Sequence, residues 1–553
     1  MIENRVYGPP GSGKTYKIVK EILPACIDKY GQAGIIVISY TRTAASEIIN
    51  RLGGKAQTFG VGDMGLDACD NVGGKVAKIK AGTLHSLCFH ALGMPEIASG
   101  KTVMDLFCRE YASAKSLIGG GGGGRLERIS MLRNKMVGID QIDEGGLKTL
   151  WRLWEEFKTR NELMDFTDLI EKSFDRIEAP GSPLCIIADE AQDLTPLQIK
   201  LLRWWNRHLK ELYLICDDDQ SIFSFIGADP NELIRMDLGA ETEIRTEILK
   251  VSRRLPVEIH KYAKKYIEKI DKRKKKEFLS NGLGGKVVNI GCAMGSDRMM
   301  KIMLDEARDR EVMVLASCDY MLNDVIDKMK ERGVRFSNRY KTDDNRWNPV
   351  SEKIWRVIEC MLRTQTAGDL CEWVEYIDDG FIIKKEPECD TTDKVVACGE
   401  SKKKEKKKRL VINDIERENL YREYLRNVLI DSEFDLFEDI WDEERGEDRY
   451  FDRMSWFMRR INIKYFKKFE YAYKILCGEY KDLKEITIGT IHSAKGRECP
   501  VVFVCPDKSP ATIKDSKFDK SAIIRLFYVA MTRASEKLFF CMPSVGKDGV
   551  IFK

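Results

Sequence analysis

Residues 8–15 read GPPGSGKT, and this short stretch decides the fold class of the chain. The spacing G-x-x-x-x-G-K-T brings backbone N–H groups around a phosphate at the start of a helix. Lys14 can reach the β and γ phosphates of a nucleotide, and the Thr15 hydroxyl can ligate Mg²⁺. A chance glycine-rich turn is the alternative, which the strand-like NRVYG before the loop and the helical pattern after it disfavour. The predicted nucleotide-binding residues of this loop are Gly8, Pro9, Pro10, Gly11, Ser12, Gly13, Lys14 and Thr15.

The length and composition favour a soluble protein of several domains. A chain of 553 residues is too long for one hydrophobic core, and length alone predicts about three to four domains. It is 43% apolar and 33% charged, and it has neither a membrane-length apolar run nor a secretory signal pattern, so we expect a cytoplasmic protein. The 16 cysteines form no CxxC pair, which indicates buried, reduced thiols rather than a zinc or iron–sulfur site.

The charge balance does not by itself reveal a partner. The net charge of +4 arises from 92 basic and 88 acidic residues. Two basic runs stand out, at 260–276 and 401–410. A solvated helix face and a loop are the favoured interpretations, and contact with a nucleic-acid backbone is the alternative.

Strand-like runs alternate with helical patterns, which predicts an α/β fold of parallel sheets covered by helices. Strands are expected within 4–8, 33–40, 183–190 and 211–219, and again within 286–291, 311–317, 485–492 and 499–506. Helices are expected from Lys14, over 43–52 and over 196–209. Two insertions with helical character interrupt the pattern, at about 87–166 and 345–480. The first contains six consecutive glycines at 119–124, which we expect to form a flexible loop.

Acidic residues follow two of the predicted strands. Asp189 ends the strand in LCIIADEAQD and is suited to hold Mg²⁺, while Glu190 is placed to polarise an attacking water. Gln220 closes the acidic stretch in CDDDQ and could sense the γ-phosphate through water. Arg254 and Arg533 are candidates to stabilise charge on the transferred phosphoryl group. Taken alone, each group also fits an ordinary solvated turn or surface arginine.

The order of seven motifs is more specific than any one of them. GPPGSGKT, SYTRTAASEI, GTLHSLC, IIADEAQDLTPLQ, CDDDQSIFSFIGAD, TIGTIHSAKGRE and RLFYVAMTRASEKL follow one another from residue 8 to 538. Together they resemble the UvrD/Rep/PcrA-like superfamily 1 DNA helicases. The resemblance implies two RecA-like (P-loop NTPase) motor domains, each with a mainly helical insertion. The implied boundaries are 1–86 and 167–250 for the first motor domain, 87–166 for its insertion, 251–344 and 481–553 for the second motor domain, and 345–480 for a reduced accessory insertion.

The resemblance also assigns site residues by motif matching. Lys14, Thr15, Asp189, Glu190 and Gln220 fall on the nucleotide face of the first motor domain, and Arg254 and Arg533 fall on the opposing face. Gly496 and Glu498 match a segment near the nucleotide sugar, and Arg253 stands where relatives have a tyrosine that stacks on adenine. The positions that match DNA contacts of the family are Tyr40, Thr83, His85, Phe225 and His492.

Four departures from the family pattern bear on function. No room remains before the phosphate loop for the adenine-reading glutamine of the family, and Ser252-Arg253-Arg254 replaces the common Asn-Tyr-Arg. We therefore expect loosened nucleobase selectivity. Ile226 stands where an arginine is common, which removes one charged link between nucleotide and DNA. The second insertion is shorter than in typical relatives, so translocation is a safer expectation than processive strand separation.

The resemblance implies an ATP-dependent translocase on single-stranded DNA and a DNA helicase that uses ATP and Mg²⁺, with 3′ to 5′ polarity. The expected partners are single-stranded or tailed duplex DNA, with a loading or nuclease protein as a further possibility. A motor that strips proteins from DNA or serves a nuclease or defence complex is the enzyme alternative. The motifs are also compatible with a nucleotide-gated binding module, and with RNA as the track. A nucleoid-associated or viral-replication setting is compatible with a cytoplasmic protein.

Overall fold

The computed structural model describes residues 2–40, 56–58, 79–118, 124–175, 178–235, 241–338, 347–351, 353–356, 463–508 and 520–544. The chain falls into two compact units. The first unit combines residues 1–299, 311–322 and 489–553, and the second combines 300–310 and 323–488. Every residue that the sequence assigns to a site falls in the first unit.

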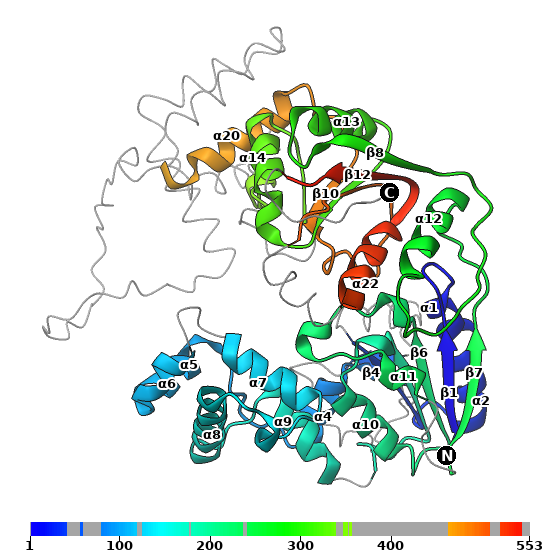
Figure 1. The fold of residues 1–553 in the computed structure, drawn as a ribbon, viewed down its shortest axis with the longest axis vertical. Coiled ribbons are helices and arrows are strands. Elements are labelled where there is room, and N and C mark those ends of the chain that lie inside the picture. Colours follow the sequence, from blue (N-terminus) through cyan, green and yellow to red (C-terminus); the bar gives the residue numbers. More distant parts are fainter. Residues whose placement is uncertain are drawn as a thin grey trace, which may run out of the picture. The chain divides into compact units, whose positions relative to one another are not determined.

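The first unit contains a seven-stranded parallel sheet in the order β3-β4-β2-β5-β6-β1-β7 (Figure 1). β1 pairs with β6 on one side and β7 on the other, so the phosphate loop leaves the interior of the sheet. Because neighbouring strands run parallel, the loops after β1, β5 and β6 meet at one edge. The strands are β1 (Ile2–Tyr7), β2 (Ile35–Ser39), β3 (Ala56–Thr58), β4 (Ile79–Gly82), β5 (Cys185–Asp189), β6 (Glu211–Cys216) and β7 (Glu243–Ile248).

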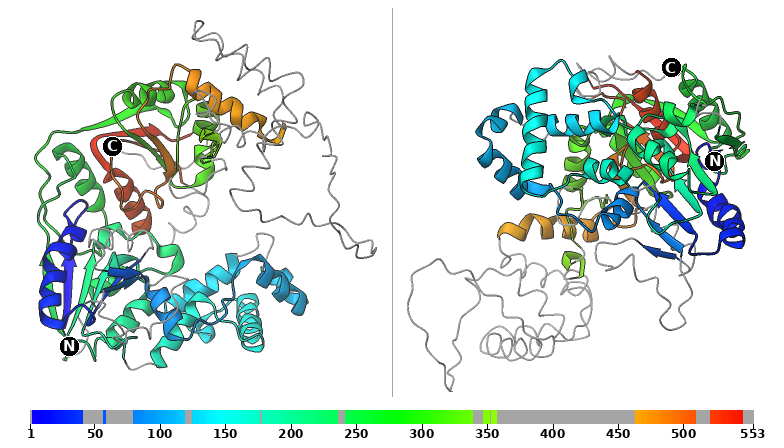
Figure 2. Two further views of the ribbon diagram at one scale, coloured as in Figure 1. Left: turned by 180° about the vertical axis from the view of Figure 1, so that it is seen from behind. Right: turned by 90° about the horizontal axis from the view of Figure 1, so that it is seen from below.

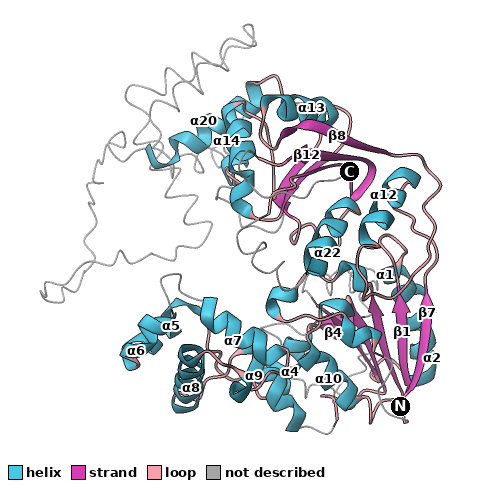
Figure 3. Cartoon of the chain, viewed as in Figure 1, coloured by secondary structure: helices cyan, strands magenta, loops and turns pink. Residues whose placement is uncertain are grey.

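Alternating side chains of these strands fill two separate cores, one on each face of the sheet. On β2, Ile35 and Val37 pack with the helical segment after the phosphate loop, while Ile36 and Ile38 pack on the opposite face. Apolar residues on successive positions of a strand are expected where helices cover both faces of a parallel sheet. Figure 3 shows these strands with helices on either side. The covering helical segments are α1 (Lys14–Lys17), η1 (Ile18–Ile22) and α2 (Leu23–Tyr30) on one face, and α4 (Leu84–Ala91), α9 (Phe166–Lys172) and α10 (Pro196–Trp205) on the other.

The first insertion is helical, as expected, and has a core of its own. Its aromatic centre contains Phe107, Trp154 and Phe157, whose ring centroids lie 5.0–5.6 Å apart. Figures 1 and 2 show these helices (cyan) as a cluster outside the layers of the seven-stranded sheet. The helices of this cluster are α5 (Gly100–Glu110), α6 (Ala112–Ile118), α7 (Gly124–Asn134) and α8 (Gly145–Arg160).

A second sheet of five strands has the order β10-β9-β11-β12-β8. β11 pairs in parallel with β9 and β12, and β12 pairs in parallel with β8. One apolar core joins this sheet to two helices of the first unit. The strands are β8 (Lys286–Ala293), β9 (Val312–Ala316), β10 (Ile486–Thr490), β11 (Cys499–Val504) and β12 (Ala534–Met542), and the two helices are α12 (Val257–Ile267) and α22 (Lys520–Met531).

The described part of the second unit is mainly helical. Its longest helix is α20 (Ile463–Cys477), where the Tyr471 hydroxyl donates a hydrogen bond to the Val334 carbonyl at 2.5 Å. The helix α14 (Asn323–Glu331) belongs to this unit, and α13 (Asp297–Ala307) begins in the first unit and ends in the second. Short helical segments of the chain are η2 (Ile139–Gln141), η3 (Ser173–Asp175), η4 (Ala191–Asp193), η5 (Asp218–Gln220), η6 (Ser224–Ile226), α11 (Asn231–Ile234) and η7 (Asp319–Leu322).

All eight strands expected from the sequence are present, and the helices from Lys14 and within 196–209 are confirmed. β3, β4, β7 and β12 were missed, and the polar EIRTEI of β7 is explained by its position at the edge of the sheet. Within the glycine run, α7 begins at Gly124, so the expectation of a loop was wrong for that residue, and 119–123 lie outside the described residues. The helix expected over 43–52, the basic run 401–410 and most of 345–480 also lie outside them. None of the helices that the structure describes is long and apolar enough to cross a membrane.

Candidate active site

The phosphate loop has the conformation expected of its glycines. Gly11 and Gly13 have positive φ values of 70° and 85°, which side chains disfavour. A Cβ on Gly8 would stand 2.3 Å from Cγ of Lys14, so only glycine fits there. The Lys14 ammonium donates a hydrogen bond to the Gly8 carbonyl at 3.0 Å and thus lies folded over the loop.

The residues of the loop fit a nucleotide phosphate. The Ser12 hydroxyl is buried and has no hydrogen-bond partner among the described residues, so a polar group is available inside the loop. The backbone after Gly13 enters α1, whose first N–H groups point into the loop. Thr15 follows Lys14 in α1, and Asp189 ends β5 at the same edge of the sheet. A phosphate oxygen with Mg²⁺ would therefore meet a hydroxyl, a carboxylate and an ammonium group.

Glu190 is held in a strained backbone conformation beside this loop. Its φ and ψ are 52° and 39°, in the left-handed region that costs a residue other than glycine about 1–3 kcal/mol. Its N–H donates to Oδ1 of Asp189 at 2.9 Å, and its carboxylate accepts a hydrogen bond from the Gln192 amide. Burial raises the pKa of Glu190, but the positive charges of Lys14 and Lys495 outweigh it and leave this pKa below its usual value. The carboxylate is thus ionised, as a group that orients water must be.

Gln220 and Arg533 connect the two sheets next to the phosphate loop. Nη2 of Arg533 donates to Oε1 of Gln220 at 2.8 Å, and the Gln220 amide donates to Asp217 at 2.7 Å. Arg533 is 1% exposed, and burial together with the neighbouring Arg254 lowers its pKa to about 9. A buried arginine with a lowered pKa gains from a nearby anion, so this side chain is suited to a phosphate oxygen.

The segment Ser252–Arg254 is tied directly to the loop. The Ser252 hydroxyl donates to the Pro10 carbonyl at 2.6 Å, and the Arg253 N–H donates to the Gly11 carbonyl at 2.8 Å. A Cβ on Gly11 would lie 2.4 Å from Cβ of Arg254, so the glycine permits this approach.

Arg254 itself is paired. Its Nε donates to Oε2 of Glu498 at 2.5 Å, two residues after Gly496, whose φ is 81°. The structure thus brings Arg254, Gly496 and Glu498 together at the loop, on the side of the second sheet. The Arg254 guanidinium is held by Glu498 rather than directed freely at the phosphate loop.

Lys495 and Asp193 form a contact that sequence reasoning missed. The Lys495 ammonium donates to Oδ1 of Asp193 at 2.6 Å and to the Gln220 carbonyl at 2.7 Å. Burial raises the pKa of Asp193 to about 7, against the opposing charge of Lys495 and with the help of Glu190. Lys495 lies in SAKGRE and Asp193 in DEAQD, two stretches already marked as motifs, but only the fold shows that they meet.

The solvated face expected of the basic run 260–276 is present on α12, where Lys261 and Lys265 are exposed, but the end of the run requires a correction. Lys276 is 4% exposed, and its ammonium donates to Asp217 at 2.8 Å and lies 2.9 Å from Asp219. Arg273 makes two hydrogen bonds to the Asp219 carboxylate, at 2.7 and 2.5 Å. Neither a solvated face nor a nucleic-acid backbone explains these two side chains, because they neutralise the buried acidic stretch after β6. Gln220, which closes that stretch and was the only one of its residues expected to serve the nucleotide, accepts a hydrogen bond from Arg533.

Arg253 lies over an aromatic ring that the sequence did not single out. Its guanidinium carbon is 5.3 Å from the ring centroid of Tyr16, the residue directly after Thr15 of the loop. Tyr16 is 47% exposed. Arginine and tyrosine thus form a cation–π pair beside the phosphate loop, where both planar groups could meet a base.

An aromatic group lies next to Lys495. Phe223 is its centre, with ring centroids 5.0 Å from Tyr40, 5.9 Å from Phe225 and 5.8 Å from His492. The Lys495 ammonium lies 5.3 Å from the Phe223 centroid. Three expected DNA-binding positions therefore do come together, and Phe223 is the member that sequence reasoning missed.

The other two expected DNA-binding positions lie at the start of α4. Thr83 is the N-cap of this helix, and its hydroxyl accepts the Ser86 N–H at 3.1 Å. His85 meets the ring of Phe166 at 5.9 Å. Thr83 thus has a capping role of its own, and His85 belongs to a second aromatic contact apart from the Phe223 group.

The fold and the site define a phosphate-loop nucleotide-binding protein with two RecA-like parallel sheets. Comparison with protein families refines this class. An AAA domain matches residues 4–226, and a UvrD-like helicase C-terminal domain matches residues 212–544. The chain belongs to the UvrD-like helicase family.

The similar helicases share limited sequence identity with the chain. ATP-dependent DNA helicase UvrD2 of Mycobacterium tuberculosis is 24% identical over 263 residues, which are 40% of this chain and 35% of the relative. Putative ATP-dependent DNA helicase YjcD of Bacillus subtilis is 26% identical over 250 residues, covering 40% of this chain and 31% of the relative. ATP-dependent DNA helicase PcrA of Staphylococcus epidermidis is 27% identical over 154 residues, covering 26% and 21%. The matched part thus spans about a third or less of each relative's length.

Proposed function

We propose that this protein is an ATP-driven translocase on single-stranded DNA that acts as a DNA helicase with 3′ to 5′ polarity. The observation that carries the proposal is the set of contacts that Lys495 makes. This one side chain donates to Asp193 and to the Gln220 carbonyl beside the nucleotide site and lies near the aromatic ring of Phe223. If ATP binding changes the distance between the two sheets, Lys495 would transmit this change to the aromatic group.

The chemistry assigned to the site is hydrolysis of the γ-phosphate of ATP, with Mg²⁺ supplied together with this substrate. Lys14 and the loop N–H groups would bind the phosphates, and Thr15 and Asp189 would hold the metal ion. Glu190, ionised and fixed by Gln192, would orient the attacking water. Arg533 would stabilise charge on the transferred group, and Gln220 would orient Arg533 through its hydrogen bond.

The aromatic group is suited to an unpaired strand. Bases stack on aromatic faces without strong sequence preference, and Phe225 is 57% exposed beside the half-buried Phe223. Tyr40 packs against Phe223 and would either extend or support this surface. Stacking alone does not separate DNA from RNA, so turnover on matched strands of each decides the track.

Two alternatives make different predictions. A motor that strips proteins from DNA, alone or within a nuclease or defence complex, hydrolyses ATP on single strands without releasing a strand from a forked duplex. A nucleotide-gated binding module hydrolyses ATP slowly, and the buried constellation of Glu190, Gln220 and Arg533 argues against it. A loading or nuclease protein is a proposed partner of either kind of motor, and the cytoplasm or nucleoid is the proposed setting.

ATP hydrolysis with and without single-stranded DNA tests the proposal. We expect strong stimulation by the strand, which Lys14→Ala and Glu190→Gln abolish. Glu190→Gln should retain nucleotide binding, because the carboxylate is expected to act on water rather than on the phosphates. Glu243→Gln, on the exposed edge strand β7, is the matched control and should behave like the parent protein. Turnover that is independent of DNA would refute the motor.

Polarity needs a separate experiment. Duplexes with a 3′ or a 5′ single-stranded tail should be unwound preferentially from the 3′ tail. Preference for the 5′ tail would overturn the proposed polarity, and ATP hydrolysis on both substrates without strand release would favour the stripping motor.

A further inference from the structure

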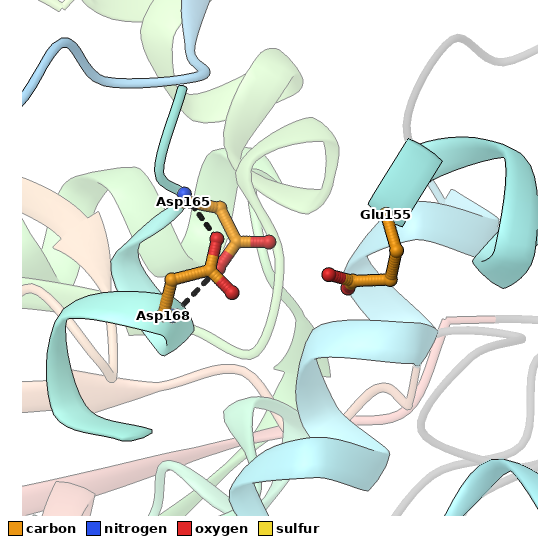
Figure 4. Close-up of side chains that lie close together, drawn as sticks. All are labelled: Glu155, Asp165 and Asp168. Atoms are coloured by element: carbon orange, nitrogen blue, oxygen red, sulfur yellow. Dashed lines mark hydrogen bonds between the residues drawn. The ribbon is translucent and has the colours of Figure 1, made fainter. Parts of the chain in front are cut away.

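A second charged cluster of the first unit is neutralised by its own partners, as the acidic stretch after β6 is. The ion cluster directly behind Phe166, the first residue of α9, pairs the carboxylates of Asp165 and Asp168 with Arg133 and Lys158. Each of the two aspartates also accepts the backbone N–H of the other, at 2.8 and 2.9 Å (Figure 4). The two cations stand where a metal ion would need to be, so this cluster stabilises the fold and is not a metal site.

A group of exposed lysines on α12 and β8 lacks such compensation. Lys261, Lys265 and Lys286 line a groove of about 490 Å³ between this helix and this strand, and Glu258 also lines it. Lys261 pairs with Glu258 at 3.0 Å, whereas Lys265 and Lys286 form no ion pair within the described part of the chain. This lysine groove therefore carries uncompensated positive charge, which attracts acidic groups.

The lysine groove has an apolar floor. Lys261, Tyr262 and Lys265 recur at the spacing of one helix face, so they lie on the same side of α12. The ring of Tyr262 packs against Phe540 of β12, with the ring centroids 5.4 Å apart, and Val287 of β8 packs against the same core. These half-buried side chains form the floor, and the exposed lysines form a basic rim.

The strand β8 is open on one side. Its only neighbour among the described strands is β12, so it forms an edge of the second sheet. Charged side chains on an edge strand discourage pairing with another chain, and β7, at an edge of the first sheet, carries Glu243, Arg245 and Glu247. In contrast, β8 has the sequence KVVNIGCA, where Lys286 is the single charged residue. An added strand therefore meets fewer obstacles at β8 than at β7.

The loop that precedes β8 is fixed next to the lysine groove. The Leu283 carbonyl accepts the Val257 N–H at 2.7 Å. Gly285 has a φ of 81°, and a Cβ there would lie 2.7 Å from the Pro256 side chain, so glycine permits this close contact with the start of α12. Leu283 is 66% exposed on this fixed loop. The groove is thus preformed, which lowers the cost of ordering it when a ligand binds.

We propose that the lysine groove and the open edge of β8 bind an extended, acidic segment of a partner protein, which adds a strand to the second sheet. Backbone hydrogen bonds to β8 provide the affinity, and acidic side chains that face Lys265 and Lys286 provide the specificity. The apolar floor and Glu258 favour such a peptide over a nucleic-acid backbone, which is negatively charged along its whole length. This surface lies outside the seven motifs and needs neither ATP nor DNA, so the inference goes beyond the proposed function and does not rest on it.

Fluorescence anisotropy with a labelled eight-residue peptide of alternating glutamate and valine tests this inference on the full chain. We expect the peptide to bind without ATP or DNA, and Lys265→Glu combined with Lys286→Glu to weaken binding about tenfold. Lys101→Glu combined with Lys115→Glu, at exposed positions of α5 and α6, is the matched control for charge and should bind like the parent protein. A peptide with lysine in place of glutamate should not bind.

Amide hydrogen exchange separates strand addition from attraction between charges alone. The N–H groups of residues 286–290 in β8 should exchange more slowly when the peptide is bound, while those of β7 should not change. Absence of this protection, or equal binding by the parent protein and the variant with both Lys265→Glu and Lys286→Glu, would overturn the inference. Displacement of the peptide by an oligothymidylate would assign the lysine groove to DNA instead.

ATP hydrolysis keeps this test apart from the test of the proposed function. DNA-stimulated hydrolysis should be unchanged in the variant with both Lys265→Glu and Lys286→Glu, which also shows that this variant is folded. If the parent protein does not bind the peptide but hydrolyses ATP on single-stranded DNA, the binding surface is wrong and the motor stands. If it binds the peptide but shows no stimulation by DNA, the proposed function fails and the binding surface stands.

Discussion

The carboxyl group of Asp193 is buried close to the Glu190 carboxylate and the Lys495 ammonium. Burial raises its pKa to about 7 in the folded chain, well above the value of 3.8 that is usual for aspartate. The folded state therefore binds a proton that the unfolded state has released between these two values. Asp193 thus lowers stability progressively as the pH rises from about 4 to about 7.

Replacing this carboxyl group should reveal that dependence. We expect the stability of Asp193→Asn, relative to the parent protein, to increase as the pH rises to about 7 and to stay constant above that. Urea unfolding midpoints of both proteins between pH 5 and 8 measure the difference. A difference that falls with rising pH would show that the ion pair with Lys495 dominates the folded state.

The contact between Arg253 and Tyr16 leads to a prediction about nucleobase selectivity. A guanidinium and a phenol ring offer planar surfaces that any base can meet, so contact with them does not select adenine. We expect ATP, GTP and CTP to support DNA-stimulated hydrolysis with similar KM values. Tyr16→Ala should raise KM for all three, whereas Tyr320→Ala, at another exposed tyrosine, should not. Strong preference for ATP would contradict this account.

At the residue scale, the sequence predicted groups whose chemistry is local. The phosphate loop is an example: its glycines, Lys14 and Thr15 lie within eight consecutive residues, so their spacing alone predicts a phosphate-binding loop. Phe223 and Lys495 escaped notice because their importance arises from contacts between segments about 270 residues apart. A lysine in a charged sequence and a phenylalanine two residues before another carry no local signal for such a role.

At the scale of elements, α12 and the segment after it show how a basic run can serve the interior. Lys276 lies among three aspartates that follow β6, and each of these carboxylates is itself buried. The lysine offsets the mutual repulsion of the three carboxylates. Its removal would leave buried negative charge without compensation.

Lys276→Ala should therefore destabilise the protein by at least about 3 kcal/mol. Lys261→Ala, at an exposed position of α12 in the same basic run, is the matched control and should unfold like the parent. Thermal or urea unfolding of the two variants gives the comparison. Equal stability would mean that the aspartates are protonated in the folded chain.

Elements were predicted well where both faces of a sheet are buried. Continuous apolar runs such as CIIAD and VMVLA gave clear strands. The edge strand β7 is polar and mostly exposed, and β12 follows directly on α22, so neither showed such a run bounded by turns. The ion cluster behind Phe166 was not predicted either, because it depends on α7, α8 and α9 meeting.

On the scale of the whole molecule, polar contacts link the two sheets of the first unit beside the phosphate loop. Gln220 with Arg533, and Asp193 with Lys495, cross from one sheet to the other beside the phosphate loop. The charged link lost at Ile226 thus has a counterpart in Lys495, which contacts the aromatic group directly. We propose that such links would let the state of the nucleotide alter the grip on a strand.

We propose that ATP hydrolysis moves the protein along single-stranded DNA. Phosphate released in a single round of binding, with a trap for free protein, measures this movement on oligothymidylates of increasing length. We expect the phosphate released per bound protein to rise in proportion to strand length. Phosphate release that is stimulated by DNA but independent of its length would contradict translocation and leave a stationary DNA-dependent ATPase.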